Sequence, residues 1–103
     1  GQGSPLAVLK LFGPRNKNYL SFPMEGFTLA LDFKNQPALF PLLDELDKIV
    51  LEYEGRVYLA KDARIKEKIF KSGYAKIKKF RRLRHQDNLE IKFQSHQSKR
   101  LGL

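Results

Sequence analysis

A short apolar run and a stretch of alternating large and small side chains lie near the beginning of the chain and predict two β-strands. The first stretch is LAVLKLF, residues 6–12, and Gly13-Pro14 closes it. In the second stretch, residues 27–33, side chains two positions apart share one face of the strand. One face is large and apolar, with Phe27, Leu29, Leu31 and Phe33. The opposite face is small and polar, with Thr28, Ala30 and Asp32.

Helical spacing replaces this alternation after residue 36 and predicts one helix over residues 37–54. Its apolar stripe consists of Leu39, Leu42, Leu43, Leu46, Ile49, Val50 and Tyr53. The opposite, polar face carries Asp44, Glu45, Asp47 and Lys48. Proline is tolerated only in the first turn of a helix, so the beginning lies near Pro37 or Pro41. Gly55 stands where a left-handed residue commonly ends a helix.

The second half of the chain predicts one more strand and two more helices. RVYLA, residues 56–60, reads as a third strand, and Asp62 is suited to cap a helix over residues 63–73. Another helix is predicted over residues 74–86. The inward side chains of these two helices are Ile65, Ile69, Phe70, Tyr74, Ile77, Phe80 and Leu83. The tail, residues 88–103, shows only a weak alternation of apolar positions.

This order of elements predicts an α+β fold: a small open sheet of about three or more strands, with helices packed on one face. The 103 residues suffice for one domain with a modest core. Residues 1–4, GQGS, have the composition of a cloning remnant, and we assign the domain to residues 5–103. No apolar run has the length of roughly 20 residues that crosses a bilayer, and no signal peptide is visible.

Charge and composition narrow the function classes. The net charge is +9, and Lys and Arg dominate from Lys61 onward. Such a bias favours an anionic partner, whether nucleic acid, a membrane surface or a phosphorylated ligand. The chain has no cysteine, which excludes disulfides and thiolate metal sites. Glycine-rich phosphate loops, metal-ligand spacings and a nucleophilic triad are also absent, so we expect no metal, and His85 and His96 are expected to be solvated.

Four segments in combination resemble the C-terminal part of FAD-linked oxidoreductases of the vanillyl-alcohol-oxidase type, and more distantly sugar-lactone oxidases. They are LKLFG, LSFPMEGFTLALDF, LLDELDKIVLEYEGRVYLAKDAR and KRLGL. The resemblance implies a fragment of a two-domain flavoenzyme that oxidises a sugar or sugar-alcohol hydroxyl, with a polyprenyl-phosphate-linked sugar as one candidate. Its partner would be the parent's own N-terminal FAD-binding domain. The fragment alone would be inactive and would not retain FAD.

The resemblance also implies roles for individual residues. Lys61 matches a lysine near the pyrimidine end of the flavin, and Tyr58 matches a tyrosine that borders the same cavity. Lys10 matches a lysine in the substrate pocket and is the catalytic candidate, while Thr28 would bind a sugar hydroxyl. Each residue has an alternative: Lys61 as a solvated strand-end lysine, Lys10 as an edge-strand lysine that opposes aggregation, and Tyr58 as a core residue with its hydroxyl at the rim.

Two positions depart from the mycobacterial-type members of this family. Those enzymes carry asparagine and cysteine in the second strand, where this chain has Thr28 and Ala30. Thr28 retains a hydroxyl that can bind a sugar, whereas Ala30 has no thiol chemistry. The match therefore indicates the flavoenzyme fold and a polyol-type substrate more strongly than one particular sugar.

The alternative function is a small basic nucleic-acid-binding domain, because residues 66–85 interleave cations with aromatic residues. The aromatic residues fall on the apolar stripe, however, and are expected in the core, which makes nucleic acid the weaker partner. The same basic helices are suited to contact an anionic membrane surface. We therefore expect a cytoplasmic protein with peripheral membrane association.

Overall fold

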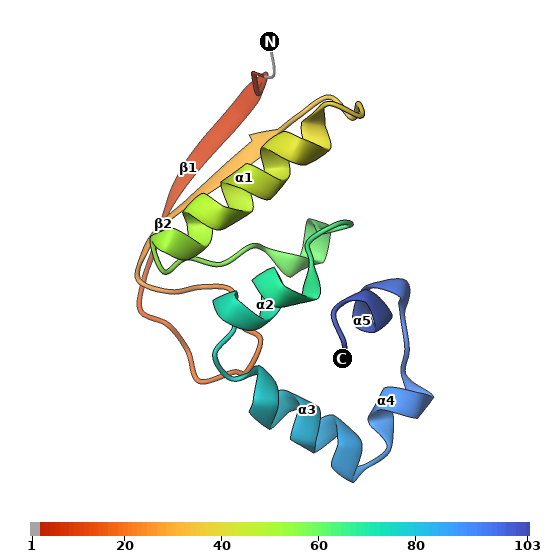
Figure 1. Cartoon of the computed structure of the whole chain (residues 1–103). Coiled ribbons are helices and arrows are strands. Elements are labelled where there is room, and N and C mark those ends of the chain that lie inside the picture. Colours follow the sequence, from red (N-terminus) through yellow and green to blue (C-terminus); the bar gives the residue numbers. More distant parts are fainter. Residues whose placement is uncertain (1–2) are drawn as a thin grey trace.

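The computed structural model describes residues 3–103 and confirms the α+β class (Figure 1). The first part of the chain contains strands β1 (Leu6–Phe12) and β2 (Gly26–Asp32), followed by helix α1 (Leu39–Glu52). The second part contains α2 (Glu67–Gly73), α3 (Ile77–Gln86), α4 (Leu89–Lys92) and α5 (His96–Arg100). Gly1 and Gln2 of the assigned remnant lie outside the described residues. Ser4 is described, and its hydroxyl donates to the Asp32 carbonyl at 2.7 Å.

The two strands form an antiparallel hairpin in which Leu9 pairs with Leu29 and Lys10 with Thr28. Directly paired residues share a face, so the predicted division into an apolar and a polar face is confirmed. Much of the apolar face is nevertheless open to solvent. Leu31 is half-buried, but four other large side chains are 58–72% exposed, namely Leu9, Leu11, Phe27 and Leu29. In Figure 1, α1 runs along the hairpin.

The expected third strand does not form in the described residues. Tyr58 has extended dihedral angles, but Leu59–Lys61 turns into a short 3₁₀ helix. A strand needs a neighbouring strand for its N–H and C=O groups, and the sheet holds only β1 and β2. Side chains bind the carbonyls of this segment instead, as described below.

α1 ends at Glu52, two residues before the expected end. Glu54, and not Gly55, has the left-handed conformation, with φ of 57°. Gly55 N–H donates to the Val50 carbonyl at 2.8 Å and Glu54 N–H to the Leu51 carbonyl at 3.0 Å, the bonds of a Schellman cap. A Cβ at Gly55 would lie only 3.0 Å from the Val50 carbonyl oxygen. Glycine is therefore required there for close approach.

The inner face of α1 also differs from the predicted stripe. Leu39 is buried, but Tyr53 is 80% exposed and Ile49 is exposed as well. Asp47, expected on the solvent face, is only 5% exposed. Its carboxylate accepts from Arg64 Nη2 at 2.7 Å, and this ion pair explains why a charged residue is buried here.

The hydrophobic core lies in the second half of the chain. Its buried members are Ile65, Phe70, Tyr74, Ile77 and Leu101. The partly buried side chains packed against them are Leu20, Val57, Leu59, Phe80 and Leu103. The inward prediction is thus confirmed for Ile65, Phe70, Tyr74, Ile77 and Phe80. Ile69 is only half-buried and lies outside this cluster, and Leu83 is exposed.

The tail folds as two short helices and not as an alternating strand. Ser95 and Ser98 form a reciprocal capping box at the beginning of α5. At its end, Gly102 has φ of 67°, and Leu103 N–H donates to the Ser98 carbonyl at 2.8 Å. This second Schellman cap turns Leu101 into the core.

Within residues 3–103, no helix is long and apolar enough to cross a membrane. The same residues contain no cluster of acidic or histidine side chains able to hold a metal ion.

Candidate functional site

The segment from Val57 to Asp62 is fastened by side chains from two later helices and their flanks. The Tyr74 hydroxyl donates to the Val57 carbonyl at 2.7 Å. Gln97 Nε2 donates to the Leu59 carbonyl at 2.7 Å and approaches the Asp62 carbonyl at 3.4 Å. These bonds take the place of the missing strand partner, and they fix the backbone of a segment that has no regular structure of its own.

Asp62 closes the turn from its other end. One carboxylate oxygen accepts from the N–H groups of Arg64 at 2.9 Å and Ile65 at 2.8 Å, while the other pairs with Arg100 at 2.5 Å. The side chain is 3% exposed, so these contacts satisfy a buried charge. The predicted capping role is therefore found on a turn, whereas the helix itself begins four residues later than expected, at Glu67.

Lys61 lies on this fastened turn and is exposed. Its ammonium makes no hydrogen bond or ion pair with any of the residues that the structure describes. The chain thus presents a free cation from a fixed backbone. An ammonium without an anionic partner is available to one supplied from outside the chain.

Lys10 and Thr28 are directly opposite one another in the hairpin and lie on the same face. Phe12 shares that face, two residues along β1 from Lys10. Its ring contacts Phe22 edge-on, with centroids 5.8 Å apart, and the Phe22 ring lies 5.1 Å from that of Tyr58. A row of aromatic rings therefore connects the Lys10–Thr28 face with Tyr58.

Tyr58 borders a cavity of about 490 Å³ beside the fastened turn. The lining residues are Leu20, Phe22, Pro23, Tyr58, Leu59, Ala60, Tyr74 and Gln97. Arg56 holds one wall in place, because its Nη1 donates to the Ser21 carbonyl at 2.8 Å while its guanidinium stacks over Tyr74. Tyr58 itself is 50% exposed, which favours a cavity wall over a core position.

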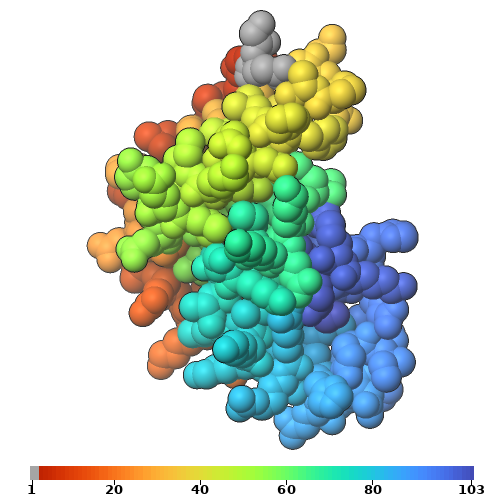
Figure 2. Space-filling view, viewed as in Figure 1, coloured from red at the N-terminus to blue at the C-terminus, as the bar shows by residue number. Residues whose placement is uncertain are grey.

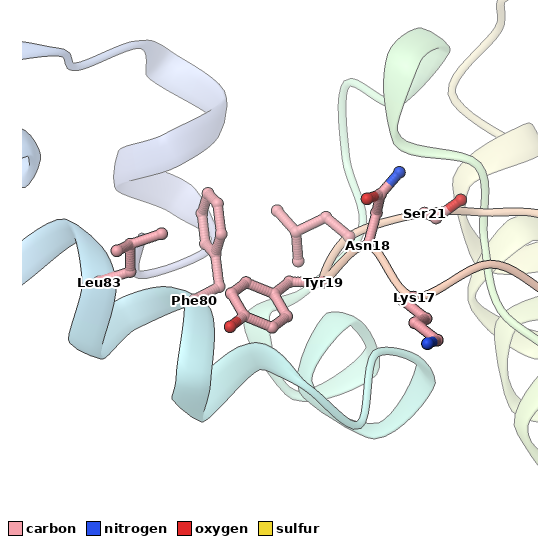
Figure 3. Close-up of a pocket in the computed structure, with 7 residues that line it drawn as sticks. Lys17, Asn18, Tyr19, Ser21, Phe80 and Leu83 are labelled. Atoms are coloured by element: carbon pink, nitrogen blue, oxygen red, sulfur yellow. The ribbon is translucent and has the colours of Figure 1, made fainter.

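A second cavity of similar volume lies between residues 17–21 and α3 (Figure 3). In Figure 3 the Tyr19 side chain reaches toward the helix that carries Phe80 and Leu83. None of the four site residues expected from the sequence lines this cavity. We therefore place the candidate site at the first cavity.

Two electrostatic features stabilise residues that contact the turn. Arg64 Nη1 binds Asp44 at 2.9 Å in addition to the pair with Asp47, which joins α1 to the turn. A hydrogen bond from Lys66 holds the pKa of Asp44 below its ordinary value. Burial raises the pKa of Tyr74 to about 12, so its hydroxyl remains a hydrogen-bond donor at neutral pH.

The structure thus brings Lys10 and Thr28 together and connects their face to Tyr58. Lys61 belongs to the adjoining turn, and no contact joins it to the hairpin pair. Sequence reasoning missed Arg56, Gln97 and Arg100, which hold the segment. Arg100 lies in KRLGL, one of the four segments singled out above, whereas a glutamine in a polar tail carries no signal of its own.

Comparison with known proteins finds relatives along nearly the whole chain. No protein-family model matches the chain. Decaprenylphosphoryl-β-D-ribose oxidase of Mycolicibacterium smegmatis is 40% identical over all 103 residues, which are 22% of that protein. A protein of uncharacterised function from Streptomyces coelicolor is 38% identical over 97 residues, 26% of its length. The chain therefore spans only about a quarter of the length of these relatives, the first of which is an oxidase.

Proposed function

We propose that this chain is the C-terminal, substrate-side part of a larger FAD-dependent oxidoreductase that oxidises a sugar hydroxyl. The observation that carries the proposal is the similarity along the entire chain to decaprenylphosphoryl-β-D-ribose oxidase. It favours a sugar linked to a polyprenyl phosphate as substrate. The remainder of the parent, with its FAD-binding domain, is the partner, and the chain alone is inactive.

The fastened turn fits one end of a flavin. Reduced flavin carries negative charge at its pyrimidine end, and the free ammonium of Lys61 is a cation suited to that charge. The backbone that presents it is already fixed by the Leu59 and Asp62 contacts. A preorganised charge needs no reorientation when the charge on the flavin develops.

The hairpin face suits a sugar. The Thr28 hydroxyl can donate and accept hydrogen bonds, and the neighbouring Lys10 ammonium can donate, so together they can orient a polyol. FAD, when bound in the parent, supplies the acceptor for the hydride that leaves the carbinol carbon. The aromatic row from Phe12 to Tyr58 adds an apolar wall, which helps to exclude water from such a site.

Peripheral membrane contact belongs to the same proposal. Lys78, Lys79 and Arg82 of α3 are exposed and have no partner among residues 3–103. Free cations on one helix attract anionic lipid headgroups, and a polyprenyl-phosphate substrate resides in a membrane. The nucleic-acid alternative is weaker, because Phe70 and Tyr74 are buried and unavailable for stacking on bases.

The test uses the full-length protein that contains this chain. Purified protein is expected to contain bound flavin, and decaprenylphosphoryl ribose is expected to reduce it. Lys61→Ala should slow flavin reduction about 10- to 1000-fold, the scale for one preorganised charge contact. Lys34→Ala, which removes another exposed lysine without a described partner, is the matched control and should react normally. Absence of flavin, or wild-type reduction by Lys61→Ala, would contradict the proposal.

A further inference from the structure

We infer that Gln97 and Arg100 of α5 are positioning residues that set the location of the Lys61 ammonium. This inference rests on the proposed function, because it assigns a role to the turn that carries Lys61. Both residues bind atoms of the turn on either side of Lys61. Each acts through the backbone of the turn that carries Lys61.

The contacts enclose Lys61 on both sides along the chain. Gln97 binds the carbonyl of Leu59, two residues before Lys61, at 2.7 Å. Arg100 binds the carboxylate of Asp62, the residue after it, at 2.5 Å. The Asp62 N–H also donates to the Leu59 carbonyl at 3.2 Å, so both helix contacts converge on one closed turn.

The helix that supplies these contacts is itself rigidly placed. The Ser95–Ser98 capping box fixes its beginning. Leu101, directly after it, is fully buried in the core. Arg81 Nη2 donates to the Leu101 carbonyl at 3.0 Å and thereby ties the helix end to α3. The turn is thus coupled to the core through α5, although Lys61 itself is solvated.

Loss of one of these contacts should therefore loosen the turn, while the Lys61 ammonium itself is retained. Misplacement of a catalytic group by about 1 Å can cost on the order of 100-fold in rate. Gln97 makes only one of several contacts that hold the turn, so we expect Gln97→Ala to slow flavin reduction about 10-fold. Arg100→Lys retains a cation beside Asp62 and should react nearly as the wild type, whereas Arg100→Ala leaves that buried carboxylate unpaired.

The experiment combines two measurements on the full-length protein. Hydrogen exchange follows the N–H groups of Asp62, Arg64 and Ile65, which are bonded only within the turn. Gln97→Ala should accelerate their exchange about 10-fold, the change expected for loss of one net hydrogen bond of about 1.4 kcal/mol. Gln94→Ala is the matched control, because Gln94 bonds only to the Glu90 carbonyl and should leave this exchange unchanged.

Rapid-mixing measurements of flavin reduction then separate positioning from a purely structural role. If Gln97 acts through Lys61, Gln97→Ala should have little further effect in a Lys61→Ala background, whereas independent effects would multiply. Unchanged exchange in Gln97→Ala, or full multiplication of the two effects, overturns the inference. Wild-type reduction by Lys61→Ala instead refutes the proposed function, and faster exchange alone would then make Gln97 a structural residue only.

Discussion

At the residue scale, the side chain that most directly links the candidate cavity to the core is Tyr74. Its ring lies in the core beside Phe70, with centroids 5.3 Å apart, and its hydroxyl binds the Val57 carbonyl next to Tyr58. One residue thus joins the core to the wall of the candidate cavity. Sequence reasoning placed Tyr74 in the core through its helical spacing, but the partner of its hydroxyl was not predictable, because Val57 lies in a segment expected to pair as a strand.

Tyr74→Phe should destabilise the folded chain by about 1–2 kcal/mol at neutral pH, because the Val57 carbonyl loses its partner. The stability of the wild type should then decline between pH 10 and about 12. In that range the unfolded tyrosine releases its proton, while burial keeps the folded one protonated. The difference in the free energy of unfolding between the wild type and Tyr74→Phe therefore becomes smaller at alkaline pH.

Urea unfolding at a series of pH values measures both effects. Tyr53→Phe is the control, because Tyr53 is exposed and its hydroxyl has no partner among the described residues. A constant difference between wild type and Tyr74→Phe from pH 7 to pH 12 would contradict the burial argument.

At the element scale, the ends of the helices help to determine where the segment from Val57 to Asp62 lies. Both α1 and α5 end in Schellman caps: the first leads into Arg56, and the second directly follows Leu101, which is buried in the core. Gly55 was correctly predicted to mark the end of α1. It allows the backbone to approach Val50 closely, however, and does not adopt a left-handed conformation. The cap of α5 went unrecognised, because its helix has only five residues and too little periodicity to detect.

Gly102→Ala should destabilise the chain by about 1–3 kcal/mol. A left-handed conformation costs a residue with a Cβ roughly 1–2 kcal/mol, and that Cβ would collide with the paired side chains of Glu67 and Arg81. Thermal unfolding of the variant should be compared with that of Gly13→Ala, where no atom lies within 4 Å of the added Cβ. Equal stability of the two variants would show that the cap contributes nothing.

The elements themselves were predictable to different degrees for physical reasons. The hairpin strands, α1 and the inward faces of α2 and α3 follow from local periodicity, and the structure retains them. The strand expected at residues 56–60 failed because a strand depends on a partner that need not be near in sequence. The same distinction between local and distant contacts applies to the site. Lys10 and Thr28 lie together because their strands form one hairpin. The Gln97 contact, by contrast, joins residues that are 38 positions apart.

At the scale of the whole molecule, the chain is extended for its length. Its radius of gyration is 14.9 Å, compared with about 13 Å for a compact domain of 100 residues. Figure 2 shows α1 and the hairpin together at one end of the molecule and α3 at the other. An open apolar hairpin face and an extended shape agree with a chain that packs against further protein in its parent.

Charge at this scale yields a prediction that separates the proposed function from the nucleic-acid alternative. With a net charge of +9, the chain should bind oligonucleotides weakly at low salt and without sequence preference. This binding should vanish by about 200 mM salt, because it depends on counterion release alone. Fluorescence-anisotropy titrations with duplex and single-stranded probes measure it. Submicromolar, sequence-selective binding at that salt would favour the alternative.

Vesicles extend the same measurement to the membrane proposal. The chain should sediment with vesicles that contain anionic lipid and not with neutral ones. Replacing Lys78, Lys79 and Arg82 by alanine should weaken this association, since each basic residue near the surface contributes about 1 kcal/mol. Undiminished sedimentation of this variant would remove α3 from the proposed membrane contact.

The separation of the hairpin from the hydrophobic core also bears on how this site can diverge between relatives. Lys10, Thr28 and Ala30 lie on strands whose side chains contribute nothing to the buried cluster around Tyr74. Substitutions at such positions usually change stability by no more than about 0.5 kcal/mol. Thr28 and Ala30 are also positions at which the resemblance described above implied a departure from mycobacterial-type enzymes. If the proposed function holds, substitutions on the hairpin can therefore change which sugar binds, while the turn that carries Lys61 remains fixed to the core.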